Sequence, residues 1–249
     1  MGKIVAIGGG ELSKGETYKI DQFIIEFANQ DKPKTLFVPT ASYEPEGYCE
    51  RFKELYQNQL GAVVEVLYLL DNQLSIYEIE EKIKWADIIY VGGGDTNHML
   101  KVWKEKHVDY FLKEAYKRGV LLCGLSAGSI CWFSYGQSEV EYEDSEDGYK
   151  YIELEGLGIL NAFHCPHFEE GRRSVEFSKM IKVSNRVGIT LENNCAIVIG
   201  DGKYRIITSQ ENKKAYKIYL QDGECIQEEI QQVDQFKSIE ELGITEGEL

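Results

Sequence analysis

Residues 121–130 read LLCGLSAGSI, an apolar run that leads into a Gly-x-Ser-x-Gly pattern at 124–128. The residues before this pattern are strand-like, and those after Ser126 are helix-like. Small residues are needed around such a turn, because the strand and the helix approach each other closely there. The stretch therefore predicts a strand, a sharp turn at Ser126 and a helix, a connection typical of α/β proteins.

Strand-like and helix-like segments alternate on the N-terminal side of this stretch. The predicted strands span 3–7, 35–38, 62–67, 87–91 and 120–124. The predicted helices lie around 20–27, 52–60, 75–85, 95–103 and 108–118. In the first of these helices, Ile20, Phe23, Ile24 and Phe27 follow the i, i+3, i+4, i+7 spacing of an amphipathic helix. This alternation predicts an α/β fold, a mostly parallel sheet with helices on both faces.

The pattern changes after about residue 195. Two Asp-Gly pairs, at 201–202 and 222–223, each separate two apolar runs. Asp-Gly between such runs is a strong signal for a β-hairpin. We therefore expect antiparallel hairpins toward the C-terminus. We interpret the chain as a single α/β domain over 1–249, with residues from about 195 to 249 as a C-terminal hairpin extension.

The overall charge is strongly negative. The 249 residues include 27 Lys and Arg against 42 Asp and Glu, so the formal net charge is 27 − 42 = −15. Non-specific binding to nucleic acid or to an anionic membrane needs a basic face, so neither partner is expected. No secretion signal is evident, and the six cysteines contain no Cys-x-x-Cys pair. We interpret them as reduced thiols and predict a cytoplasmic protein.

One segment concentrates acidic residues. Residues 139–147 contain six acids in nine positions. Such a run is typical of a solvated surface loop, and that is the interpretation we favour.

Ser126 is the candidate nucleophile. The hydroxyl at such a turn projects from the sheet edge, and the following helix directs its N–H groups toward the same place. A serine needs a base to react at neutral pH. Two of the four histidines, His164 and His167, lie in the segment FHCPHF at 163–168. With Cys165 they could also be read as metal ligands, but the spacing is too short for a usual two-pair zinc site, so no metal is predicted.

Two glycine clusters follow predicted strands. They lie at 8–10 and at 92–94. Neither has the spacing of a dinucleotide-binding loop or a P-loop, so no cofactor is predicted. A glycine-rich loop that approaches Ser126 could instead supply backbone N–H groups to an oxyanion.

Five motifs occur together in a familiar order. They are IGGGE at 7–11, VGGGDT at 91–96, GLSAG at 124–128, PHF at 166–168 and GITLE at 188–192. From residue 1 to about 200 the chain thereby resembles the serine peptidase family of aspartyl dipeptidase (dipeptidase E) and cyanophycinase. The resemblance implies a fold like that of class I glutamine amidotransferases, with a central parallel sheet.

The resemblance also implies a catalytic triad. Ser126 matches the family nucleophile, His167 the general base, and Glu192 the acid that orients the base. Glu169 is an alternative acid, because it stands two residues after His167, a spacing used in amidotransferases of this fold. Glu139 and Glu141 are further candidates. The order Ser, His, Glu differs from the Ser, Asp/Glu, His order of α/β-hydrolases, which counts against an ordinary esterase.

The same resemblance assigns the surroundings of the nucleophile. Gly93 or Gly94, together with the N–H of Ala127, matches the oxyanion hole. Arg172 and Arg173 lie where the family places substrate-binding arginine, and a carboxylate substrate needs such a cation. An alternative for this pair is a surface position at the start of a helix.

These observations lead to an expected function. We expect a serine peptidase that hydrolyses small peptides through an acyl-enzyme, with aspartyl dipeptides as candidate substrates. The His-Cys-Pro-His segment differs from the Asn-Pro-His of aspartyl dipeptidases, and this difference leaves the aspartyl preference open. The alternatives are an amidase or amidotransferase-like hydrolase, and a non-catalytic binding protein on the same scaffold. The partner is a small peptide substrate, and a homodimer stays open.

Overall fold

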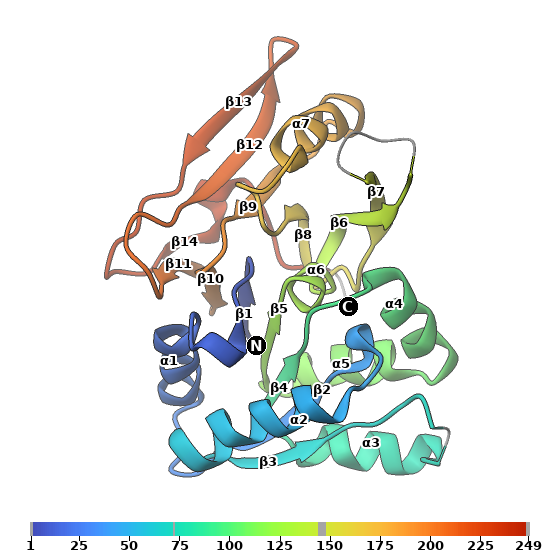
Figure 1. Cartoon of the computed structure of the whole chain (residues 1–249). Coiled ribbons are helices and arrows are strands. Elements are labelled where there is room, and N and C mark those ends of the chain that lie inside the picture. The colour runs from blue at the N-terminus through green and yellow to red at the C-terminus, as the bar shows by residue number, and fades with distance from the viewer. Residues whose placement is uncertain (1, 72, 144–147, 248–249) are drawn as a thin grey trace.

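The computed structural model describes residues 2–71, 73–143 and 148–247. Two β-sheets and the surrounding helices form the molecule (Figure 1). The hairpin of β12 and β13 projects at the top of this view, and the helices α2 and α3 lie at the bottom. The Gly-x-Ser-x-Gly turn lies between these regions, where β5 passes into α6.

The first sheet has eight strands in the spatial order β14-β11-β10-β1-β5-β4-β2-β3. Its strands are β1 (Lys3–Ile7), β2 (Lys34–Val38), β3 (Val63–Val66), β4 (Ile88–Val91), β5 (Leu121–Leu125), β10 (Cys195–Gly200), β11 (Lys203–Thr208) and β14 (Lys237–Ser238). The five strands from β1 to β3 in this order are parallel to their neighbours. β10 pairs antiparallel with β1, and β11 and β14 continue antiparallel to the edge.

The second sheet has six strands in the order β13-β12-β9-β8-β6-β7. They are β6 (Phe133–Glu141), β7 (Tyr149–Glu155), β8 (Leu160–Cys165), β9 (Gly188–Leu191), β12 (Ala215–Gln221) and β13 (Glu224–Glu229). The three inner strands β6, β8 and β9 run parallel, and the outer pairings are antiparallel. This sheet therefore carries both the segment after the elbow and the histidine segment at the end of β8.

Helices cover both faces of the first sheet. The helices are α1 (Tyr18–Ala28), α2 (Glu46–Lys53), α3 (Ile76–Trp85), α4 (Thr96–Glu105), α5 (Val108–Lys117), α6 (Ala127–Ile130) and α7 (Arg173–Ser184), of which α7 packs on the second sheet. Side chains of α1 and α2 pack with Val5 and Ile7 on one face. Those of α3, α4 and α5 pack with Ile4 and Ala6 on the other. Successive side chains of β1 thus pack alternately into two hydrophobic cores, as expected for a strand buried on both faces.

The structure confirms the α/β class and the mostly parallel sheet. Both predicted hairpins are present, but they separate: β10 and β11 extend the first sheet, whereas β12 and β13 extend the second. The second sheet was not predicted. Its strands β6 and β7 mix buried and exposed residues without a continuous apolar run, so periodicity alone indicates them poorly. The single-domain interpretation over 1–249 stays a prediction.

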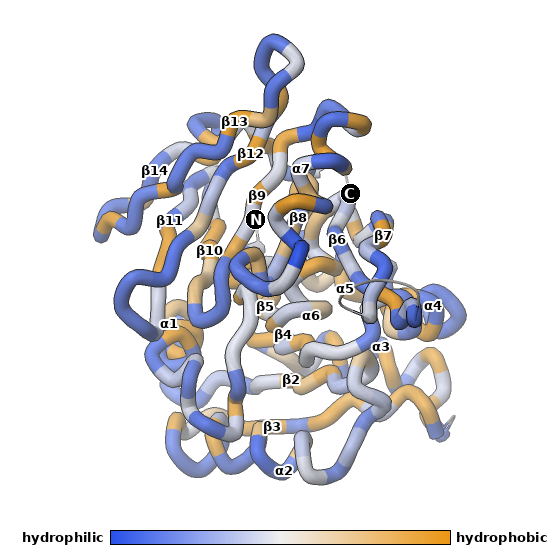
Figure 2. Tube along the Cα trace, turned by 45° about the horizontal axis from the view of Figure 1, so that its top comes forward, coloured by the Kyte–Doolittle hydropathy of each residue, from blue (hydrophilic) through white to orange (hydrophobic). Residues whose placement is uncertain are grey.

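Hydropathy follows this arrangement. In Figure 2 the interior strands of the first sheet carry hydrophobic colour, and many of the outer turns are hydrophilic. Within the described part of the chain, every helix is too short or too polar to cross a bilayer. All six cysteines are described and none forms a disulfide.

Candidate active site

Ser126 lies at a sharp turn between β5 and α6. Its backbone angles are φ 55° and ψ −113°, a combination that non-glycine residues rarely adopt. A Cβ on Gly124 would collide with the carbonyl of Gly128, and a Cβ on Gly128 would collide with that of Val91. The two glycines of the motif are therefore required by close backbone approach. The predicted strand, turn and helix are present.

His167 reaches the nucleophile from the second sheet. Its Nε2 lies 2.8 Å from the Ser126 Oγ, and its backbone N–H donates to the Gly8 carbonyl at 3.0 Å. A Cβ on Gly9 would overlap the imidazole ring. The first glycine cluster thus provides space for the histidine. This loop therefore belongs to the site although its spacing is not that of a cofactor-binding motif. The structure brings Ser126 and His167 together.

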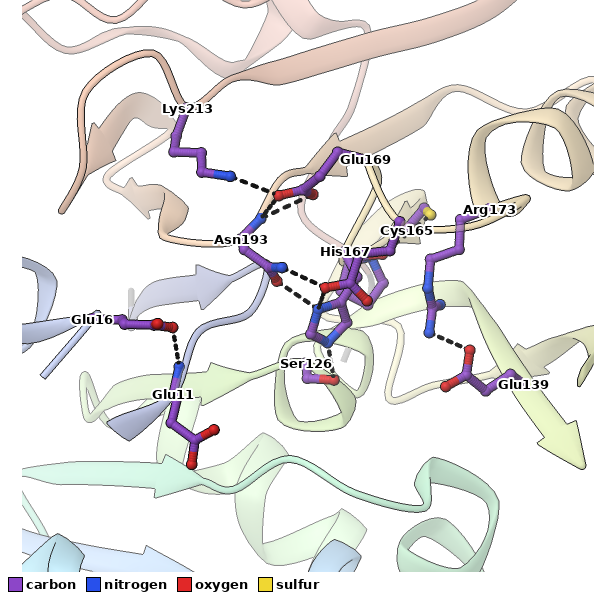
Figure 3. A network of polar contacts seen from close by, with 12 residues as sticks. Glu11, Glu16, Ser126, Glu139, Cys165, His167, Glu169, Arg173, Asn193 and Lys213 are labelled. Atoms are coloured by element: carbon purple, nitrogen blue, oxygen red, sulfur yellow. Dashed lines mark hydrogen bonds and ion pairs between the residues drawn. The ribbon is translucent and has the colours of Figure 1, made fainter. Parts of the chain in front are cut away.

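The other ring nitrogen of His167 faces Asn193. Nδ1 lies 2.6 Å from the Asn193 Oδ1, and the Asn193 Nδ2 donates to the Glu170 Oε1 at 2.5 Å. The same Glu170 oxygen lies 3.6 Å from the Nδ1 of His167. The interaction with the His167 ring, ahead of the hydrogen bond from Asn193, holds the pKa of Glu170 down to about 2. Figure 3 shows Asn193 between Glu169 and the ring of His167.

The structure does not bring Glu192 to the imidazole. Its carboxylate accepts from the Lys214 N–H at 3.0 Å and from the Tyr216 hydroxyl at 3.4 Å, both near the start of β12. Successive side chains leave the chain in different directions here, so Asn193 takes the place next to the ring. Glu169, the alternative acid, accepts from the Asn193 backbone N–H at 3.0 and 3.1 Å. It also pairs with Lys213 at 2.9 Å.

The expected oxyanion-hole residues lie around Ser126. A Cβ on Gly93 would come within 3.3 Å of the Ser126 Cβ, so this glycine faces the nucleophile. Its N–H donates to the hydroxyl of Tyr48, whose pKa burial raises to about 12. A Cβ on Gly94 would instead meet the Ala41 carbonyl, and Gly94 lines the smaller of the two cavities described below together with Ser126. The N–H of Ala127 opens the first turn of α6.

The two arginines have different surroundings. Arg172 pairs with Glu176 at 2.6 Å and is 39 % exposed. Arg173 is only 8 % exposed and pairs with Glu139 on β6, while its guanidinium lies 5.7 Å from the ring centre of Tyr151. The expected solvated loop is therefore partly wrong, because Glu139 lies on a strand beside a buried cation. Residues 144–147 of that segment lie outside the described residues.

Two cavities flank the nucleophile. The larger, of about 420 Å³, is lined by His167, Gly93, Tyr48 and Arg51 among others. The smaller, of about 40 Å³, is lined by Ser126 together with Thr96, Gln137, Glu139 and Arg173. Ser126 thus lines the smaller cavity, and its partner His167 lines the larger one.

A second serine and histidine pair lies close to the first in sequence. Ser129 comes three residues after Ser126, and His164 comes three residues before His167. The Ser129 Oγ lies 2.9 Å from the His164 Nε2, and the His164 Nδ1 lies 2.8 Å from the Ile189 carbonyl oxygen. Burial lowers the pKa of His164 to about 3. Cys165 does not join this histidine: its thiol contacts the Gln137 Oε1 at 3.0 Å, and burial raises its pKa to about 12. Within the described part of the chain, no three His, Cys, Asp or Glu side chains converge as metal ligands would.

Comparison with known proteins now identifies the family. The model of peptidase family S51 matches residues 4–207. This chain belongs to peptidase family S51. It is 32 % identical over 230 residues to the uncharacterized peptidase YgaJ of Bacillus subtilis (strain 168), covering 90 % of this chain and 95 % of that protein. A shorter match, 36 % over 108 residues, joins it to the uncharacterized peptidase Lmo0363 of Listeria monocytogenes serovar 1/2a (strain EGD-e), with 42 % and 51 % covered.

Solved structures agree on the fold of this S51 chain. A peptidase from an acI-B1 Actinobacterium superposes with a TM-score of 0.69 and 21 % identity, covering 96 % of this chain and 97 % of that one. A putative peptidase E from Listeria monocytogenes EGD-e superposes with a TM-score of 0.59 and 21 % identity, covering 84 % and 98 %. The resemblance inferred from the motifs is thereby confirmed at the level of family and fold.

Some site residues have weak sequence signals. Asn193, Glu170 and Tyr48 were not predicted, because their positions depend on how distant segments meet. Gly9 had a signal, the triplet at 8–10, but the histidine that it accommodates is 158 positions further along the chain. Only the assembled fold assigns these four residues to the site.

Proposed function

We propose that this chain is a serine peptidase that hydrolyses small peptides through an acyl-enzyme on Ser126. The observation that carries the proposal is the 2.8 Å contact between the Ser126 Oγ, at a strained turn that lines the smaller cavity, and the His167 Nε2, whose ring lines the larger one. Membership of peptidase family S51 supports the same class of reaction.

The reaction proceeds in two halves. His167 takes the proton of the Ser126 hydroxyl while the oxygen forms a bond to the peptide carbonyl carbon. The carbon–nitrogen bond then breaks, and the imidazolium gives its proton to the leaving amine. A water molecule repeats the sequence on the acyl-enzyme and releases the acid. The base and nucleophile return to their starting states, so protons and bonds balance over the cycle.

Backbone groups next to Ser126 would stabilise the oxyanion. The Ala127 N–H at the start of α6 is the first donor, and the loop at Gly93 is the second side of the site. The N–H of Gly93 donates to the Tyr48 hydroxyl, and Tyr48 lines the larger cavity. Gly94, which lines the smaller cavity together with Ser126, is the alternative glycine for this role.

Aspartyl dipeptides are the first substrates to compare. The smaller cavity offers Arg173, but Glu139 already pairs with that guanidinium. A substrate carboxylate has to replace this partner. Arg172 pairs with Glu176 at 2.6 Å, and it is the more exposed cation of the two. Rates on Asp-Leu and Leu-Leu separate the aspartyl preference from a general peptidase activity, because equal rates would remove that preference.

Covalent labelling tests the nucleophile directly. The wild-type chain is treated with a small sulfonyl fluoride and with a fluorophosphonate, and the intact mass is compared with that of Ser126→Ala and His167→Ala. A single adduct on the wild type alone, with turnover of small peptides, supports the proposal. If the folded wild type shows neither an adduct nor peptide turnover, a binding protein on this scaffold is favoured. Turnover of glutamine or esters without peptides would indicate an amidase.

A further inference from the structure

Asn193 is held from two sides by consecutive carboxylates. Glu169 accepts from its backbone N–H at 3.0 Å, and Glu170 accepts from its side-chain Nδ2 at 2.5 Å. Both acids belong to the turn that follows His167, in which the Glu170 N–H donates to the His167 carbonyl at 2.9 Å. The residue beside the imidazole is therefore clamped by the segment that carries the imidazole.

The clamp determines how the amide of Asn193 is oriented. A carboxylate at low pKa only accepts hydrogen bonds, so the nitrogen of the amide has to face Glu170. The amide oxygen then faces the His167 Nδ1, at 2.6 Å. An amide oxygen also only accepts, so Nδ1 carries the proton and Nε2 is left with its lone pair toward the Ser126 hydroxyl.

From this order of donors and acceptors we infer that Asn193 and Glu170 are the positioning residues of His167: Glu170 orients the Asn193 amide, and the amide holds the imidazole in the tautomer that can accept the serine proton. The inference rests on the proposed function for its kinetic consequences, but the tautomer itself is a property of the resting protein. It assigns the third position of the triad to an amide backed by a carboxylate, in place of Glu192.

Without Glu170, the end of the Asn193 amide that faces His167 is no longer fixed. An unrestrained amide can turn over and place its Nδ2 toward Nδ1, which stabilises the tautomer protonated at Nε2. That tautomer cannot accept a proton from Ser126. A wrong tautomer is a severe defect in enzymes of this type, as the loss of about 10⁴-fold for an Asp-to-Asn change in a serine protease triad illustrates.

Glu170 also supplies negative charge to the imidazolium. Its nearest oxygen lies 3.6 Å from Nδ1, and its side chain is 51 % exposed, so solvent weakens the interaction. Arg173 adds a smaller positive influence on the same carboxylate. The neighbouring charges Glu169 and Lys213 neutralise each other at 2.9 Å. Glu170 is thus the acid whose charge acts on the ring.

Nuclear magnetic resonance on the full chain tests the tautomer without reference to activity. Long-range ¹H–¹⁵N correlations of the four histidine rings are recorded for the wild type, with His167→Ala providing the assignment. We expect His167 to be protonated at Nδ1 in the wild type and to lose this single signature in Glu170→Ala. Unchanged His167 signals in the folded Glu170→Ala chain would overturn the inference.

Kinetics of two Glu170 variants give the second readout. We expect Glu170→Ala to lower kcat by about 10- to 100-fold with less than about threefold change in KM, as for other residues that orient a ligand or base. Glu170→Gln, whose amide oxygen can still accept from Asn193, should recover most of kcat. Because it lacks the charge, the acidic limb of its kcat/KM profile should move to lower pH by about 0.5 unit.

The comparison variants separate this role from a structural one. Glu80→Gln on α3, where Glu80 pairs with Lys84 at 2.9 Å, is the matched acid-to-amide control and should change neither readout. Glu192→Gln represents the acid that the family resemblance implies. If Glu192→Gln shifts the acidic limb and disturbs the tautomer while Glu170→Gln does neither, the inference is wrong. Failure of the proposed function would appear as an inactive wild type, and the tautomer experiment would still decide the positioning role.

Discussion

The molecule contains two serine and histidine pairs of nearly equal length. Ser126 and His167 lie 2.8 Å apart, and Ser129 and His164 lie 2.9 Å apart. Ser126 is the turn residue after β5 and Ser129 lies in α6, while both histidines come from the end of β8 or just beyond it. The first pair is bordered by cavities, whereas His164 is fully buried with its ring 4.3 Å from that of Phe133.

The difference teaches that a hydrogen-bonded serine and histidine are not by themselves a catalytic pair. In the inner pair, Ser129 and His164, the fixed Ile189 carbonyl sets the tautomer of His164, and burial keeps its ring neutral. In the outer pair, Ser126 and His167, the Asn193 amide held by Glu170 lies at the Nδ1 of the ring instead of a backbone carbonyl. Access, a strained turn at the serine and a charge that can support an imidazolium distinguish the outer pair.

The largest expected difference lies in the two serines. Ser126→Ala should lower kcat by about 10⁴- to 10⁶-fold, because nucleophile and base act as a unit. Ser129→Ala should lower it by less than about tenfold. Steady-state hydrolysis of small peptides by both variants measures the contrast. Comparable losses in the two variants would mean that the pairs are not functionally distinct.

The buried His164 should link the stability of the fold to pH. The pKa of His164 is near 3 in the folded chain, against an ordinary value of 6.5 that applies when it is unfolded. Between these values the unfolded chain binds a proton that the folded chain does not, so the free energy of unfolding falls as the pH drops from about 6.5 to about 3. The contribution is at most on the order of 5 kcal/mol.

Denaturant titrations at a series of pH values measure this linkage. His164→Gln cannot titrate, so its free energy of unfolding should fall less steeply with acid than that of the wild type. His107→Gln, at an exposed position, is the matched control and should keep the wild-type slope. Equal slopes for the wild type and His164→Gln would show that the buried ring is not kept neutral by the fold.

A smaller effect is expected on stability when the inner serine is removed. Ser129→Ala leaves the Nε2 of His164 buried without its partner, and an unpaired buried group of this kind costs about 1–3 kcal/mol. Ser126→Ala should cost less, because its pair borders open space. Chemical denaturation of the two variants at neutral pH provides the test. The reverse order would contradict the assignment of Ser129 to a structural pair.

The smallest expected effect concerns charge near the outer pair. Glu139→Gln removes the anionic partner of the buried Arg173, so a substrate carboxylate should meet less competition there. We expect the ratio of kcat/KM on Asp-Leu to that on Leu-Leu to rise by about three- to tenfold. Glu153→Gln, whose partner Arg186 lies 2.7 Å away at the surface, is the control. An unchanged ratio would mean that Arg173 does not contact the substrate.

Local sequence patterns predicted the elements around Ser126 well. The apolar strand, the glycines and the short helix depend on neighbours within a few residues, and the structure has all of them. The family motifs also predicted His167, which the structure brings to Ser126. The orienting group could not be predicted in this way. Glu192 and Asn193 are adjacent in sequence, yet Glu192 contacts Lys214 whereas Asn193 contacts His167.

By itself, the sequence determined the α/β alternation, the elbow and the residue types that can perform acyl transfer, because these depend on periodicity and on close contacts between chain neighbours. Only the tertiary structure decided which serine and histidine pair is accessible and which groups orient the base. Those properties depend on the packing of β8, the loop after β9 and the first glycine cluster, segments that meet only when both sheets are assembled. Side-chain direction and burial at such meeting points are set by the whole fold, and no local pattern encodes them.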